Sequence, residues 1–215
     1  MSLPGYEADE VLAQYLLLHY GSPADTLPFR QGPKSALDFP QRCVTETVEI
    51  AKVPPQARAL DLGCAVGRAS FELARFCADV VGIDSSRRFI ETAQRLQRGE
   101  AVDYTIPEQG ELHKHLRAQV PPDIDRTRLQ FELGDAHALR DDLGTFDVVL
   151  MANLLCRLER PRACLAQLPA LVRPGGQVVI TTPSTWKQIF TPREHWLGGY
   201  DQDGKAVRTL DGLKE

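Results

Sequence analysis

The feature that most constrains the fold of this chain is an alternation of short apolar segments and helical patterns that begins after Pro54 and Pro55. Runs of four to eight apolar residues between turn signals indicate buried strands. Strands that alternate with helices predict a parallel sheet covered by helices on both faces, so we expect a doubly wound α/β fold. The expected strands are Arg58–Leu62, Asp79–Ile83, Leu129–Leu133, Phe146–Met151 and Gln177–Thr181.

The remaining segments divide the 215-residue chain, which has the length of one domain, into a cap and a core. Residues 1–53 are predicted to form an N-terminal helical cap, and residues 54–215 the core, with a polar insertion at about 99–126. In the cap we expect helices over 8–20 and Phe39–Ala51, the second capped by Asp38. Elsewhere we expect helices over Val66–Phe76, from Ser85 or Ser86 to about Gln97, near Leu112–Gln119 and over Pro161–Val172.

Composition argues against several classes of protein. The net charge is −4 with no basic block, which speaks against a nucleic acid as the main partner. No stretch reaches the roughly 18 apolar residues of a membrane span, and the N-terminus lacks the basic start and apolar run of a signal peptide. Five cysteines without paired spacing predict reduced thiols and a cytoplasmic protein. Neither C-x-x-C nor H-E-x-x-H occurs, so we expect no metal site.

The first expected strand runs into a glycine-rich turn. Gly63 permits a sharp turn at positive φ, Ala65 stays small where a ligand must approach the backbone, and Gly67 lets the next helix pack closely. Asp84 ends the next strand, where a carboxylate can accept both hydroxyls of a ribose. Nicotinamide cofactors use a similar layout, but with G-x-G-x-x-G, whereas here Gly63-x-Ala65-x-Gly67 follows Asp61 by two residues. A dehydrogenase, or a turn that binds nothing, remains an alternative at this point.

Later motifs favour one of these readings. Gly134-Asp135-Ala136 follows the third strand, Asn153 follows the fourth, and Arg173-Pro174-Gly175-Gly176 precedes the fifth. With the glycine turn, this series resembles the Rossmann-like class I methyltransferases that use S-adenosyl-L-methionine and release S-adenosyl-L-homocysteine. The resemblance implies that Asp135 bonds the adenine amino group, that the Ala136 backbone contacts the ring, and that Asn153 lies beside the sulfonium and the acceptor. The expected cofactor-binding residues are Asp61, Gly63, Cys64, Ala65, Gly67, Asp84, Ser85, Asp135, Ala136, Asn153 and Arg42.

The chain lacks the N-P-P-Y or D-P-P-Y motif of nucleic-acid amino-methyltransferases, since the fourth strand continues as Asn153-Leu154-Leu155-Cys156. A narrower resemblance lies in Leu18-His19-Tyr20-Gly21, Cys64 to Leu73, Ala152 to Leu158, Phe190-Thr191-Pro192 and Trp196 to Gly199. These segments resemble the mercaptohistidine N-methyltransferase family, which includes the C-terminal domain of the ovothiol-biosynthesis protein. The resemblance runs from about Tyr15 to the end of the chain and implies methylation of an imidazole nitrogen of a thiol-bearing histidine.

One departure concerns the end of the chain. A class I sheet continues with a sixth and a seventh strand, but here the residues after Thr181 are predicted to be loop-like until Leu210, so the last two strands are expected to be absent. An open sheet edge exposes unpaired backbone groups. We therefore expect a homo-oligomer or another partner to cover this edge.

The resemblance also suggests residues for the acceptor. Asn153, Tyr20 and His19 are the catalytic candidates, with Tyr15, His19 and Tyr20 forming a lid. Arginine forks suit carboxylates of substrate or cofactor, which favours Arg42 and Arg157. The substrate-binding candidates are Tyr15, Arg157, Trp186 and Trp196. Each has a plainer interpretation as a packing or surface residue. Two further functions stay open, namely methylation of another small molecule and a shortened, non-catalytic module that binds S-adenosyl-L-methionine.

Overall fold

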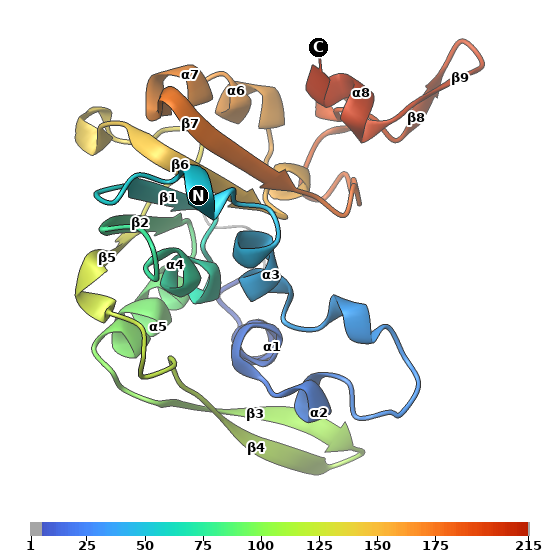
Figure 1. The fold of residues 1–215 in the computed structure, drawn as a ribbon. Helices are drawn as coiled ribbons and strands as arrows, with labels where there is room; N and C mark the ends of the chain where they lie inside the picture. Colours follow the sequence, from blue (N-terminus) through green and yellow to red (C-terminus); the bar gives the residue numbers. More distant parts are fainter. Residues whose placement is uncertain (1–5, 215) are drawn as a thin grey trace.

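The computed structural model describes residues 6–214 and has one central sheet with helices on both of its faces (Figure 1). The five predicted strands all form and pair in parallel, in the order β5-β2-β1-β6-β7. The predicted doubly wound α/β fold is therefore confirmed. The strands are β1 (Arg58–Leu62), β2 (Asp79–Asp84), β5 (Leu129–Leu133), β6 (Phe146–Ala152) and β7 (Val172–Thr181).

Side-chain alternation along the central strands builds two cores, one on each face of the sheet. In β1, Ala59 belongs to one core, and Leu60 and Leu62 belong to the other. In β6, Val148 and Val149 divide in the same way. Because both faces are covered, these strands read as nearly continuous apolar runs, which is why the sequence located them.

The helix predicted from Ser85 or Ser86 to about Gln97 forms as expected, whereas the one predicted over Val66–Phe76 is shorter. On one face lie α4 (Arg68–Leu73) and α5 (Arg87–Gln97), and on the other α6 (Pro161–Leu165) and α7 (Leu168–Leu171) (Figure 1). The single helix predicted over Pro161–Val172 is wrong, because Pro169 stands in the first turn of α7, where a missing N–H is tolerated but an ongoing helix is not. β7 begins at Val172 rather than Gln177, since its pairing with β6 continues through a register shift.

The N-terminal segment contributes α1 (Asp9–Tyr20), α2 (Pro23–Thr26) and α3 (Phe39–Thr45). The second predicted helix ends earlier than expected. Asp38 precedes α3 at φ 55° without a side-chain capping bond, so its predicted role as a cap is wrong. α1 and α3 bury side chains in the same core as α4 and α5, and a separate cap over residues 1–53 stays a prediction. Single 3-10 turns are Lys34–Ala36, Ile50–Lys52, Arg126–Arg128, Asp141–Leu143, Leu155–Arg157 and Arg193–His195.

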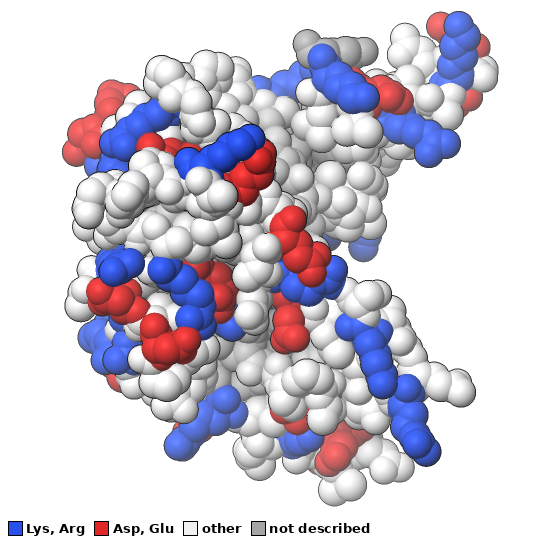
Figure 2. Space-filling view, viewed as in Figure 1, with Lys and Arg blue, Asp and Glu red and all other residues white. Residues whose placement is uncertain are grey.

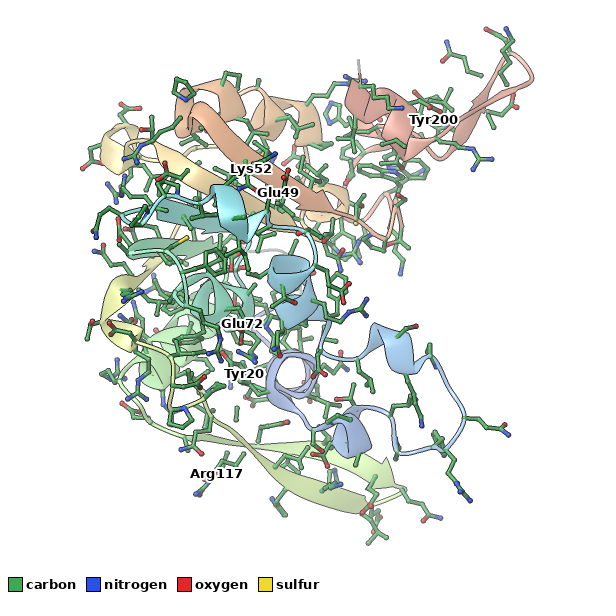
Figure 3. The ribbon with its side chains drawn as sticks, viewed as in Figure 1. Tyr20, Glu49, Lys52, Glu72, Arg117 and Tyr200 are labelled. Atoms are coloured by element: carbon green, nitrogen blue, oxygen red, sulfur yellow. The ribbon has the colours of Figure 1, made fainter. Side chains whose placement is uncertain are left out.

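The polar insertion is a β-hairpin, so the helix predicted near Leu112–Gln119 is wrong. β3 (Val102–Gln109) and β4 (Leu112–Ala118) pair antiparallel around Gly110, whose φ is 57°. Burial alternates along β3 because one face packs against α1. The other face is polar, and Arg117 on it pairs with Asp103 across the strands, 2.6 Å between Nε and Oδ1 (Figure 3).

The residues after Thr181 are more ordered than predicted. β8 (Tyr200–Gln202) and β9 (Lys205–Val207) form a second hairpin, followed by α8 (Thr209–Lys214). This hairpin projects at the upper right of Figure 1 and does not join the central sheet. Within residues 6–214, β7 therefore has a strand neighbour on one side only, and a partner that covers its other side stays a prediction.

Charges of both signs are mixed on the face shown in Figure 2. Glu49 and Lys52 form one such pair beside β7 (Figure 3), 2.6 Å between Oε2 and Nζ. No helix in the described part of the chain is long and apolar enough to cross a membrane.

Candidate functional site

A groove with two lobes lies at the carboxyl ends of β1, β2, β5 and β6. Ligands bind at this edge in open parallel sheets. The first lobe, called here the α1 lobe, lies under α1 and the start of α3; the second, the β5 lobe, lies between the ends of β5 and β6. Both lobes share Gly63, Asp84, Ser85, Leu154 and Arg157, so they lie side by side, and together they are called the groove here.

The glycine turn forms the floor of the groove. Gly63 has φ 79°, and a Cβ on it would lie 2.8 Å from Cδ1 of Leu154. Ala65 has φ 48°, a conformation that costs energy for a residue with a side chain and that recurs at ligand sites. The small residues that the sequence placed here therefore keep the backbone accessible from the groove.

Gly67 has the packing role predicted for it but does not reach the groove, although it was also expected to bind the cofactor. Its φ is 86°, and a Cβ would lie 2.7 Å from Cζ of Phe131, but Gly67 does not line either lobe. It permits close packing of α4 and contacts no ligand space.

Asp84 stands at the junction of the two lobes. Its Oδ2 accepts a hydrogen bond from Ala65 N at 2.9 Å, and its Oδ1 accepts one from Ser86 N at 2.9 Å. Burial raises the pKa of Asp84, while these backbone donors hold the carboxylate in one orientation. Of the two serines proposed to cap the next helix, Ser86 does so by accepting from Phe89 N, and Ser85 lines both lobes.

A second carboxyl group lies below the floor. Asp61 is 1% exposed and lines the α1 lobe, where its Oδ2 accepts a hydrogen bond from Ser70 Oγ at 2.6 Å. Burial raises the pKa of Asp61 to about 7, and the neighbouring Asp84 adds to the effect. Near neutral pH this group can gain or lose a proton when a charged ligand binds beside it.

The β5 lobe contains the predicted pair Asp135 and Ala136, together with His137, which the sequence reasoning missed. Oδ1 of Asp135 accepts from the backbone N and lies beside the ring Nδ1 of His137, both at 2.9 Å. Burial alone would raise the pKa of Asp135, but the hydrogen bonds from His137 outweigh it and lower that pKa. The sequence signal that could have identified His137 is its place two residues after Asp135, where an imidazole can contact the carboxylate.

Two of the predicted lid residues line the α1 lobe, and the third does not. Tyr15 and His19 face the lobe. Tyr20 is turned toward α4, as Figure 3 shows, and its hydroxyl donates to Val66 O at 2.8 Å. Burial, with a smaller contribution from Arg68, lowers the pKa of His19 to about 3, so its imidazole is neutral. Its Nδ1 is buried and makes no hydrogen bond to any residue within 6–214.

Asn153 and Arg157 also reach the groove, as predicted. Asn153 has φ 56°, a left-handed conformation that asparagine tolerates well, and its backbone N donates to Thr181 O at 2.9 Å. The guanidinium of Arg157 lies 4.7 Å from the ring centre of Phe190 and donates to Cys156 O at 3.1 Å. These contacts hold a cation where the two lobes meet.

Three further predicted ligand-binding residues, Arg42, Trp186 and Trp196, lie outside the groove. Arg42 pairs with Glu46 through two bonds of 2.6 and 2.8 Å on the surface of α3. Trp186 and Trp196 stack on each other and donate to Thr209 Oγ1 and Thr191 O, both at 2.8 Å. The two tryptophans therefore attach the C-terminal segment to the core and do not wall either lobe.

Cys64 does line the α1 lobe, but burial raises the pKa of its thiol well above the usual value. All five cysteines are buried as free thiols. A buried thiol of this kind is a packing group with little thiolate character.

Comparison with known proteins gives the family. A family model described as a methyltransferase domain matches residues 30–208. The chain belongs to this methyltransferase family. With that membership, the predicted class I fold and the predicted cofactor, S-adenosyl-L-methionine, are confirmed.

Individual relatives are more distant. A ubiquinone biosynthesis O-methyltransferase of Xanthomonas axonopodis pv. citri is 27% identical over 153 residues, covering 70% of this chain and 53% of that protein. Phosphoethanolamine N-methyltransferase 3 of Arabidopsis thaliana is 27% identical over 164 residues, 73% of this chain and 28% of that protein. The chain thus spans about half, or less, of the length of these relatives. The solved CcbJ methyltransferase of Streptomyces caelestis is 21% identical, with a TM-score of 0.47 over 66% of this chain and 50% of that one.

The groove fits the chemistry of this cofactor. Asp84 is an acceptor held in place by two backbone N–H groups, as a ribose diol requires. Gly63 leaves the floor open where a Cβ would meet Leu154, and Asp135 provides a second acceptor in the other lobe.

Proposed function

We propose that this chain transfers a methyl group from S-adenosyl-L-methionine to an imidazole nitrogen of 4-mercaptohistidine (5-thiohistidine), a reaction of ovothiol biosynthesis. The observation that carries the methyltransferase part is the pair of adjoining lobes, with the oriented carboxylate of Asp84 lining both of them. The cofactor supplies a methyl group that is already activated as a sulfonium, so the protein mainly positions the reactants.

The nucleoside would lie across the junction and the β5 lobe. Asp84 accepts the ribose hydroxyls, and Asp135 accepts the adenine amino group beside the backbone of Ala136. The amino-acid end of the cofactor would extend over Gly63 and Ala65 toward Asp61. A positive charge beside Asp61 favours its carboxylate, so an ammonium at this place would release the proton that burial retains.

The acceptor would enter the α1 lobe. Tyr15 and His19 provide aromatic surface, and Arg157 provides a cation for a carboxylate. A neutral imidazole acceptor attacks through one nitrogen and must lose a proton from the other after it is methylated. The lowered pKa of His19 makes its neutral ring a poor base, so that proton would leave to solvent, and His19 and Asn153 would contact the acceptor ring as neutral groups. Holding the two reactants in line contributes about 7–11 kcal/mol to lowering the barrier in the best-oriented cases.

The choice of a thiol-histidine depends on the resemblance of Leu18–Gly21, Cys64–Leu73, Ala152–Leu158 and the later aromatic segments to the mercaptohistidine N-methyltransferases. A second candidate, methylation of another small molecule, is favoured by the relatives that act in ubiquinone biosynthesis as O-methyltransferases. The two candidates share the cofactor site and differ only in what the α1 lobe accepts.

The test is calorimetric titration of the purified chain with S-adenosyl-L-methionine, followed by mercaptohistidine and measurement of S-adenosyl-L-homocysteine release. Histidine without the thiol is the matched control substrate. Release with mercaptohistidine alone supports the proposal, and release with a phenolic acceptor instead supports the second candidate. Binding without release for either would indicate a non-catalytic module, and no binding by the folded chain would overturn the proposal.

A further inference from the structure

His137 lies in the loop between β5 and β6 and connects two parts of the β5 lobe. On one side its Nδ1 lies 2.9 Å from Oδ1 of Asp135. On the other side its Nε2 lies 3.2 Å from the backbone N of Arg160, the residue that precedes α6. The side chain of His137 is 15% exposed and lines the groove.

The second contact determines where the proton of the ring lies. A backbone N–H can only donate, so Nε2 must present its lone pair to Arg160. A neutral imidazole then carries its proton on Nδ1, directed at Oδ1 of Asp135. Because the backbone N of His137 donates to the same oxygen, two donors from one residue set the plane of this carboxylate.

A second contact attaches the loop to Gln167, the residue that precedes α7. Nε2 of Gln167 donates to Ala136 O at 2.8 Å. These two contacts thus hold Ala136 and His137, the two residues that follow Asp135, against the residues that precede α6 and α7. A loop held in this way presents the carboxylate in one position.

We propose that His137 is a positioning residue that orients Asp135 so that the groove selects a purine with an amino group at its 6-position over one with an oxygen there. This inference rests on the proposed function, in which Asp135 faces the adenine amino group. A carboxylate accepts hydrogen bonds and donates none, so it pairs with an amino group and repels a carbonyl oxygen. Discrimination depends on the carboxylate keeping its orientation, which is what the two donors of His137 provide.

The experiment compares the dissociation constants of S-adenosyl-L-homocysteine and S-inosyl-L-homocysteine for wild type, H137N and H137L. H137N keeps an N–H near the place of Nδ1, whereas H137L removes both ring contacts. H113N is the matched control, because His113 is exposed on the β3–β4 hairpin with Nδ1 beside Glu111 O. Melting temperatures confirm that each variant is folded.

We expect wild type, H113N and H137N to prefer the adenosyl ligand, and H137L to lose about tenfold or more of that preference, the worth of a hydrogen bond to a charged group. Affinity of H137L for the inosyl ligand should stay the same or improve. Equal weakening of both ligands, or equal behaviour of H137N and H137L, would show a merely structural role and overturn the inference. Wild type that binds neither ligand would overturn the proposed function itself, whereas wild type that binds both equally would overturn only the inference.

Discussion

Replacement of Asp84 by asparagine is the most informative single change in the groove. The carboxylate uses one oxygen for Ala65 N and the other for Ser86 N, and its remaining lone pairs face both lobes. In D84N one of these oxygens becomes an NH2 group, which cannot accept from either backbone donor. The variant therefore loses the negative charge toward the ribose and leaves one backbone N–H without its acceptor.

Each loss has a magnitude. A hydrogen bond to a charged group contributes about 1.5–3 kcal/mol, which corresponds to roughly a 10- to 150-fold rise in the dissociation constant of S-adenosyl-L-homocysteine. The unsatisfied donor costs about 1–3 kcal/mol of folding free energy, which a domain with about 5–15 kcal/mol in total withstands. Calorimetric titration gives the first quantity, and urea unfolding without ligand gives the second.

The matched control is D103N, which removes a carboxylate on the exposed face of the β3–β4 hairpin, away from both lobes. Its affinity for S-adenosyl-L-homocysteine should equal that of wild type. If folded D84N bound the ligand as tightly as D103N does, Asp84 would not contact the ribose and the assignment of the groove would be refuted.

Three further variants test other parts of the site. Because burial raises the pKa of Asp61 to about 7, the folded state holds a proton that the unfolded carboxyl releases near pH 4. The free energy of unfolding should therefore fall by up to roughly 4 kcal/mol between about pH 4 and 7 and then level off. Urea unfolding at a series of pH values should show a smaller fall in D61N, and an equal fall in D61N and wild type would contradict the raised pKa. G63A should lose about 1–2 kcal/mol of folding free energy from its positive φ, and it should bind S-adenosyl-L-homocysteine more weakly because its Cβ meets Leu154. The control G175A, at φ 83° with nothing within 4 Å of its Cβ, should lose stability only. Equal affinities of the two variants would contradict the assignment of Gly63 to the floor of the groove. W186F removes the bond to Thr209 and should speed proteolysis of residues 199–214 without changing KM for the acceptor, whereas a raised KM in a folded variant would place Trp186 in the site after all.

Local sequence patterns determined the layout of the cofactor end of this protein. The five parallel strands are short runs buried on both faces, and such runs are visible in the chain itself. Gly63, Ala65 and Asp84 were predicted because each stands at the end of a strand or in the turn that follows it, where backbone geometry restricts which residue types fit. Parallel strands bring their carboxyl ends to one edge, so sequence order alone was enough to assemble these residues into a site.

Tertiary packing decided which side chains reach the groove. Tyr15 and Tyr20 both lie on α1, but only the packing of α1 against α3 and the β3–β4 hairpin turns Tyr20 toward Val66 and leaves Tyr15 in the lobe. The segment near Leu112–Gln119, expected to be a helix, forms β4 because it pairs with β3, and α1 covers one face of the hairpin. This pairing partner is distant from the local pattern that was used to predict a helix.

Tertiary packing also explains why the sequence missed His137 and misplaced Trp186 and Trp196. The ring of His137 is oriented by Arg160, 23 residues away along the chain, and Trp186 by Thr209, also 23 residues away. A sequence specifies residue types and local geometry, but the direction of a side chain depends on hydrogen-bond partners that only the folded chain brings within about 3 Å. The sequence by itself therefore determined the sheet and the floor of the groove, and the tertiary structure decided its walls.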